Sequence, residues 1–80
     1  MSKQVIIYTT PTCTYCKMAK EYFTKNNISY SEKDVARDET ARNEMLDKSG
    51  QMGVPVIDVG GQVVVGFYKE KLAELLSIPV

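Results

Sequence analysis

Thr12-Cys13-Thr14-Tyr15-Cys16-Lys17 contains both cysteines of the 80-residue sequence. An apolar, β-branched run at residues 5–8, Val-Ile-Ile-Tyr, precedes this stretch, and a segment of helical periodicity follows it. A Cys-x-x-Cys pair between a strand and a helix, in a small α/β pattern, is typical of redox chemistry.

The position of the two cysteines predicts different roles for them. The first backbone N–H groups of a helix that begins near Cys13 have no intrahelical partner, and they favour an anion such as a thiolate. A cysteine in that position can have its pKa lowered from about 8.5 to roughly 3.5–7.5, and Lys17 adds positive charge nearby. Cys13 is therefore the expected nucleophile. Cys16, buried one turn further on, is expected to attack the mixed disulfide and release the substrate.

Two other uses of a cysteine pair are less consistent with this sequence. A purely structural disulfide across so short a loop would remove little chain entropy. A zinc site needs about four ligands, whereas this chain has two cysteines and no histidine. A complete zinc site would therefore require a second subunit.

The composition is that of an ordinary soluble globular protein. Apolar residues make up 44% and charged residues 25% of a length that suggests one domain. Ten basic and ten acidic residues balance, which argues against nucleic acid as a partner. The apolar run after Met1-Ser2-Lys3-Gln4 is too short for a signal peptide or a membrane span. A cytoplasmic protein is expected, and in a reducing cytosol a cysteine pair is more often catalytic than structural.

The first half of the chain predicts two strands and two helices. The continuous run at residues 5–8 predicts a strand buried on both faces, and residues 29–34 predict a second strand parallel to it. Residues 14–26 and 38–48 predict helices, the second ending at Gly50. The residues expected to pack are Cys16, Met18, Ala19, Tyr22 and Phe23 in the first helix, and Ala41, Met45 and Leu46 in the second.

The second half predicts a hairpin and a last helix. Residues 54–59 and 62–65 read as antiparallel strands joined by Gly60-Gly61. Residues 69–77 predict a helix that ends before Pro79, with Leu72, Leu75 and Leu76 on its buried side. The expected fold class is α/β, in the order βαβαββα, with helices on both faces of a four-stranded mixed sheet.

Val54-Pro55 is the second segment expected to carry function. If this peptide bond were cis, the N–H and C=O groups of Val54 could turn outward beside the cysteines. Cis bonds are essentially a proline feature, but only a minority of prolines adopt them. The residues alone therefore leave the isomer open.

The whole chain resembles the glutaredoxin branch of the thioredoxin superfamily. The resemblance rests on Ile7-Tyr8-Thr9, Cys13-Thr14-Tyr15-Cys16, Val54-Pro55 and Val65-Gly66-Phe67, in that order. It implies a thioredoxin fold, a cis Pro55, and backbone hydrogen bonds from Val54 to a bound peptide or glutathione. It also implies that Cys13 attacks protein disulfides or glutathione mixed disulfides and that Cys16 resolves them.

Three departures from the family pattern concern glutathione. Thr14 replaces a proline, residues 9–12 lack the usual lysine, and Phe67-Tyr68-Lys69 replaces an acidic pair. Tyr15 and the backbone around Gly66, Phe67 and Tyr68 could still contact glutathione. Val65-Gly66-Phe67 also resembles the Ser-Gly-Phe segment of redoxins that feed ribonucleotide reductase and are reduced by thioredoxin reductase.

The expected protein is a monomeric dithiol–disulfide oxidoreductase with no tightly bound cofactor and no metal. Its expected partners are disulfide-containing protein substrates, with glutathione or thioredoxin reductase as the electron donor. One alternative is a module that binds an iron–sulfur cluster between two monomers with glutathione as a ligand. Another is a partner-binding domain without catalysis.

Overall fold

The computed structural model describes residues 4–78 and contains the elements in the predicted order. The strands are β1 (Val5–Thr9), β2 (Ser31–Asp34), β3 (Val56–Val59) and β4 (Gln62–Val65). The helices are α1 (Thr14–Lys25), α2 (Glu39–Ser49) and α3 (Lys69–Leu76). The thioredoxin-like βαβαββα fold is thus confirmed.

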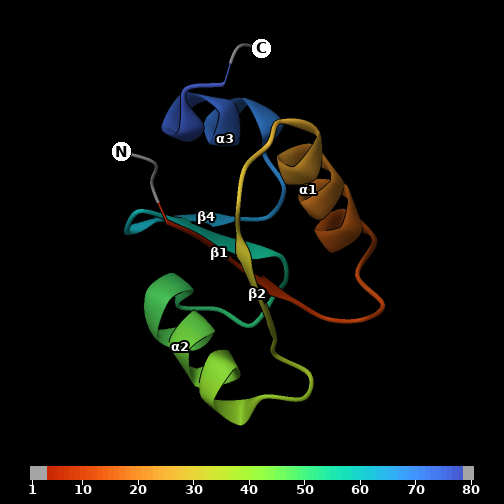
Figure 1. Ribbon diagram of the computed structural model, residues 1–80. Helices are drawn as coiled ribbons and strands as arrows, with labels where there is room; N and C mark the ends of the chain where they lie inside the picture. The colour runs from red at the N-terminus through yellow and green to blue at the C-terminus, as the bar shows by residue number, and fades with distance from the viewer. Residues whose placement is uncertain (1–3, 79–80) are drawn as a thin grey trace.

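The four strands form one mixed sheet in the order β2-β1-β3-β4. β1 runs parallel to β2 and antiparallel to β3, and β3 pairs antiparallel with β4. Figure 1 shows α1 and α3 on one face of the sheet and α2 on the other. Since β1 is central and covered on both faces, its continuous apolar run is explained.

The two faces of the sheet are stabilised differently. On the α1/α3 face, Ile7, Phe23 and Leu72 are completely buried within one large apolar cluster. On the α2 face the cluster is smaller, and α2 contributes only Ala41 and Met45 to it. The α2 face therefore depends more on polar contacts.

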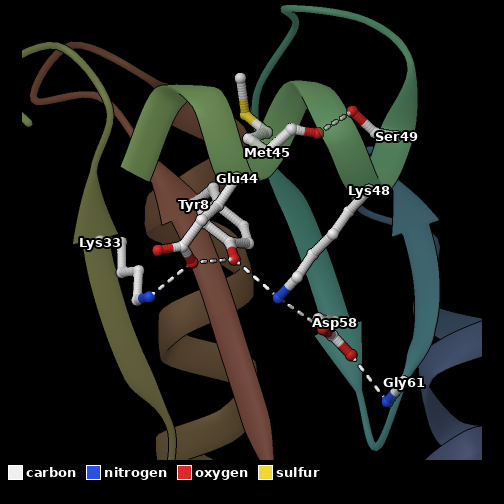
Figure 2. A network of polar contacts seen from close by, with 8 residues as sticks. All are labelled: Tyr8, Lys33, Glu44, Met45, Lys48, Ser49, Asp58 and Gly61. Atoms are coloured by element: carbon white, nitrogen blue, oxygen red, sulfur yellow. Dashed lines mark hydrogen bonds and ion pairs between the residues drawn. The ribbon is translucent and has the colours of Figure 1, made fainter. Parts of the chain in front are cut away.

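Those polar contacts form a chain that joins α2 to three strands (Figure 2). The Lys48 ammonium lies 2.8 Å from the Asp58 carboxylate and donates to the Tyr8 hydroxyl at 2.8 Å. That hydroxyl donates to Glu44 at 3.2 Å, and Lys33 pairs with the same carboxylate at 2.7 Å. Because Tyr8 is fully buried, the network gives its hydroxyl the partners that burial requires.

Two side chains predicted to pack are instead largely exposed. Met18 is 44% and Leu46 42% exposed, because each lies on the outer side of its helix, whereas Ala19 and Met45 beside them are buried. β2 begins at Ser31 rather than residue 29, and β3 at Val56 rather than residue 54. Residues 54 and 55 form the approach to β3, where the proline provides no N–H for a ladder.

The predicted ends of the helices are otherwise close to those observed. Gly50 ends α2 in the left-handed conformation, with φ of 71°, as a glycine can do without steric cost. Pro79, expected to follow the last helix, lies outside the described residues. Within residues 4–78, no helix combines the length and apolarity needed to cross a membrane.

Candidate active site

Cys13 is the N-cap residue of α1, and its sulfur occupies the place of a capping oxygen. The Cys13 Sγ accepts a hydrogen bond from the backbone N–H of Cys16 at 3.1 Å, and the two cysteines form a disulfide. Cys16 is 1% exposed, whereas Cys13 is only half-buried. An N–H donor and a helix N-terminus both stabilise negative charge on the Cys13 sulfur. The more accessible cysteine is thus also the one that caps the helix.

A polar cluster that the sequence analysis missed lies at the end of β1. The buried Thr9 hydroxyl donates to Glu32 at 2.9 Å, and Lys20 pairs with the same carboxylate oxygen at 2.8 Å. The hydrogen bond from Lys20, helped by that from Thr9, outweighs desolvation and holds the pKa of Glu32 below its usual value. The cluster ties α1 to β1 and β2 just before the cysteine loop.

This cluster depends on strand register. Ile7 of β1 lies beside Glu32 of β2, so that Glu32 and Thr9 face the same side of the sheet, toward α1. The only signal in the sequence was the charge of Glu32 within an otherwise uninformative strand. If the β1–β2 register is not known, Glu32 is interpreted as a solvent-exposed charged residue.

The Val54–Pro55 peptide bond is cis. Pro55 is completely buried, while Val54 is half-buried, and its backbone N–H and C=O have no hydrogen-bond partner among residues 4–78. The β1–β3 register pairs Tyr8 with Val56 and thereby brings Pro55 toward the end of β1 that leads to the cysteines. The two segments that the sequence singled out therefore lie toward the same end of the two central strands.

The segment before α3 lies toward the same end of the sheet. Gly66 donates its N–H to the Pro55 carbonyl at 2.7 Å and adopts a φ of 95°, a conformation that favours glycine. Tyr68, which is 63% exposed, lies against Gly66, since a Cβ built there would be 3.2 Å from its ring. Gly66 and Tyr68 are thus available beside Pro55.

The other two aromatic candidates differ in their exposure. Tyr15, within the Cys-x-x-Cys segment, is 62% exposed. Phe67 is half-buried, packs against the core and makes an edge contact with Tyr22, with ring centroids 5.9 Å apart. Phe67 therefore anchors the segment before α3 to the core, whereas the Tyr15 side chain is accessible to a ligand.

No cluster of three or more His, Cys, Asp or Glu residues that could hold a metal occurs in the described part of the chain. The chemically competent groups are the two sulfurs and the backbone around them. Such an arrangement can exchange two electrons between a dithiol and a disulfide.

Comparison with known proteins places this site within a family. Residues 5–64 match the family model of glutaredoxin. A glutaredoxin-like 8.6 kDa protein in the rubredoxin operon of Clostridium pasteurianum is 46% identical over 71 residues, covering 89% of this chain and 95% of that protein. Glutaredoxin 3 of Escherichia coli strain K12 is 36% identical over 62 residues, covering 78% of this chain and 75% of its own.

Solved structures agree with this assignment. The crystal structure of the thioredoxin-like protein BC3987 superposes with a TM-score of 0.85 at 40% identity, covering 90% of this chain and 99% of that one. The glutaredoxin-like NrdH-redoxin from Escherichia coli gives a TM-score of 0.79 at 25% identity, covering 90% and 93% of the two chains. With its cysteines joined at the start of α1, this chain belongs to the glutaredoxin family and is a thiol–disulfide oxidoreductase.

Proposed function

We propose that this protein reduces disulfides of protein substrates by a dithiol mechanism and that thioredoxin reductase, rather than glutathione, returns it to the dithiol form. In this mechanism Cys13 is the nucleophile and Cys16 the resolving cysteine. The observation that carries these roles is the difference in exposure, since only Cys13 is accessible to a partner while Cys16 is buried behind it. The protein acts as a monomer, without a bound cofactor.

The reaction balances over two exchange steps. The Cys13 thiolate attacks one sulfur of the substrate disulfide, forms a mixed disulfide and releases the other substrate sulfur as a thiolate, which takes up a proton. Cys16 then loses its proton and attacks the Cys13 sulfur, which releases the second substrate thiol. The substrate gains two electrons and two protons, and the protein is left with the Cys13–Cys16 disulfide seen here.

The distribution of charge supports a protein reductase as the electron donor. Glutathione carries two carboxylates and one ammonium group. The loop before Cys13 offers no lysine for a carboxylate, and α3 begins with Lys69, a cation that would repel the ammonium group. The Lys69 ammonium lies over the Tyr22 ring, 5.7 Å from its centroid.

Exposed apolar side chains around the site favour contact with a protein surface. Their exposed fractions are 62% for Tyr15, 52% for Met52, 42% for Val65 and 63% for Tyr68. Aromatic and methionine side chains are enriched in protein–protein interfaces. The NrdH-redoxin of Escherichia coli is described as having a thioredoxin-like activity profile, and we extend this profile to the present chain.

Glutathione is the second candidate donor, favoured by the backbone groups of Val54, which have no hydrogen-bond partner within the described residues 4–78. Glutaredoxin 3 shares more sequence with this chain than NrdH-redoxin does. The charge at the start of α3 should affect the binding of glutathione but not that of thioredoxin reductase. Changing this charge therefore distinguishes the two electron donors.

The test compares two reducing systems with insulin as the disulfide substrate. NADPH oxidation is followed with thioredoxin reductase alone, and separately with glutathione plus glutathione reductase. We expect turnover with thioredoxin reductase and little with glutathione. In the Lys69→Glu variant, glutathione-dependent turnover should rise, while Lys71→Glu, a matched change on the same helix, should not alter it. Turnover with glutathione only would overturn the choice of donor.

The roles of the cysteines are tested separately. Cys16→Ser should accumulate a mixed disulfide with a substrate, detectable by mass, whereas Cys13→Ser should form none. A mixed disulfide on Cys16 in the Cys13→Ser variant would reverse the proposed roles.

A further inference from the structure

In the loop between α2 and β3, the Gln51 side chain forms two hydrogen bonds with the backbone of Gly53, as a neighbouring strand would. The Gly53 N–H donates to Gln51 Oε1 at 2.6 Å, and Gln51 Nε2 donates to the Gly53 carbonyl at 3.1 Å. One carboxamide thus pairs with both backbone polar groups of the residue before Val54. A Cβ at residue 53 would lie 2.7 Å from Gln51 Oε1, so this pairing needs glycine there.

The carboxamide is itself anchored to the end of α2. Gln51 Nε2 also donates to the Ser49 hydroxyl at 3.2 Å. The Ser49 Oγ in turn lies 2.6 Å from the carbonyl of Met45, a contact drawn in Figure 2. Met45 is completely buried against the sheet. The orientation of the Gln51 side chain is therefore fixed by contact with the end of α2, and not by the loop alone.

The consequence for Val54 follows from the planarity of the peptide bond. The carbonyl of Gly53 and the N–H of Val54 belong to one trans peptide unit, in which they point in opposite directions. When Gln51 binds the Gly53 carbonyl, it turns the Val54 N–H away from itself, to the side where that group has no partner among the described residues 4–78. A hydrogen bond accepted by the carbonyl also polarises the same peptide unit, which makes its N–H a better donor.

We propose that Gln51 is a positioning residue for substrate recognition, which aims the N–H of Val54 at the backbone of a bound disulfide-containing segment. This inference rests on the proposed function, in which such a segment pairs with Val54. It predicts that Gln51 affects the capture of peptide-like substrates and leaves the reactivity of the Cys13 sulfur unchanged.

Two variants of Gln51 and one control test the inference. Gln51→Ala removes both hydrogen bonds with Gly53. Gln51→Glu keeps an oxygen that can accept from the Gly53 N–H, but it loses the Nε2 group that donates to the Gly53 carbonyl. Gln62→Ala is the matched control, because Gln62 is exposed on β4. Thermal unfolding of each variant checks that the fold is intact.

The readout is the oxidation of prereduced protein, which involves no electron donor. Its rate is measured against increasing concentrations of insulin, and also against dithiodipyridine, a small disulfide with no peptide backbone. Both Gln51 variants should raise the half-saturating concentration of insulin about fivefold, the equivalent of about 1 kcal/mol for one hydrogen bond. Their limiting rate with insulin, and their rate with dithiodipyridine, should match those of the wild type and of Gln62→Ala.

The outcomes separate this inference from the proposed function. If the prereduced wild type fails to reduce the disulfides of insulin, the proposed function is wrong. If the wild type reduces insulin and the Gln51 variants have the same half-saturating concentration, Gln51 does not position Val54. An equal loss of rate with both substrates would also overturn the inference, because it would mean that the thiol itself had changed.

Discussion

Replacing Lys48 with methionine tests whether the polar chain over the sheet holds α2 in place. The substitution keeps most of the aliphatic stem and removes the ammonium group, which contacts Asp58 and the Tyr8 hydroxyl, each at 2.8 Å. The Asp58 side chain is only 11% exposed and would retain a single hydrogen bond, from the Gly61 N–H at 2.8 Å. Without Lys48, little would offset the cost of keeping an ionised carboxylate in this largely buried position.

The burial of the pair sets the size of the effect. Removing one partner from a buried ion pair costs about 3–5 kcal/mol, whereas exposed pairs contribute about 0–1 kcal/mol. The Lys48 side chain is 30% exposed, which places this pair between the two limits. We therefore expect a loss of about 2 kcal/mol in the free energy of unfolding, or a fall in Tm of about 8–16 °C for a chain of this size.

The pH dependence gives the effect a distinctive signature. Desolvation is the largest single effect on both groups and works against both charges, but the hydrogen bonds and the charge attraction together outweigh it, so the pKa of Asp58 is lowered and that of Lys48 is raised. A lowered carboxyl pKa contributes stability above the unfolded value of about 3.9, which is lost as pH falls through the folded pKa. A raised lysine pKa contributes stability below about 10.4, which is lost as pH rises through the folded pKa. The difference between wild type and Lys48→Met should thus be largest near neutral pH and shrink at both extremes.

The measurement is urea unfolding of the oxidised protein, followed by circular dichroism across this pH range. Lys33→Met is the matched control, because the Lys33–Glu44 pair belongs to the same network but both side chains are about one-third exposed or more, at 34% and 38%. The control should lose clearly less stability. Equal losses in the two variants, or a Lys48→Met deficit that persists unchanged in acid, would refute the reasoning.

Three further predictions concern the rest of the frame. Leu72→Ala, at a fully buried position of α3, should cost about 2–5 kcal/mol in urea unfolding; a loss below about 1 kcal/mol would contradict the packing described. Gly66→Ala should cost about 1–2 kcal/mol, because residue 66 has a φ of 95°, and it should displace the Tyr68 ring, measurable as a change in that ring's NMR shifts. Glu32→Gln removes a carboxylate whose pKa is lowered by Lys20. The wild type loses the stability that this carboxylate contributes as pH falls through its folded pKa, whereas the variant lacks that contribution at every pH. The acid-unfolding curve of this variant should be shallower, and an unchanged curve would argue against the pairing.

Patterns that depend only on local chemistry predicted most of the fold. The run at residues 5–8 indicated a central strand, and the Gly60-Gly61 pair placed the hairpin between β3 and β4. The cysteines marked the start of α1, since a helix N-terminus and a capping side chain are features of sequence neighbours. Leu46 was misplaced because α2 packs on a thin stripe, where a helical pattern alone does not decide which flank faces the sheet.

The supporting polar contacts could not be predicted in the same way. Thr9 meets Glu32 only because β1 and β2 pair in one particular register. Gln51 is close to Gly53 in sequence, yet a glutamine in a loop has many rotamers, and the hydroxyl that selects one of them belongs to the end of α2. Such contacts are decided by tertiary structure, and they surround the cysteines and Val54 without being part of the motif itself.

The two halves of the site are therefore held by different physical means. The Cys13–Cys16 segment begins a helix whose buried side lies in the large apolar cluster, so the position of the sulfurs depends mainly on hydrophobic packing, to which the Lys20–Glu32 pair adds one ion pair. Val54 follows α2, which packs on the sheet with only Ala41 and Met45 and is held there in addition by the Lys48–Asp58 ion pair, while Ser49 and Gln51 order the loop that leads to Val54. Electrostatic contacts respond to pH and packing contacts far less. Substrate capture by Val54 should accordingly weaken in acid before the frame around the cysteines is lost, a separation that the insulin and dithiodipyridine rates, measured side by side against pH, would detect.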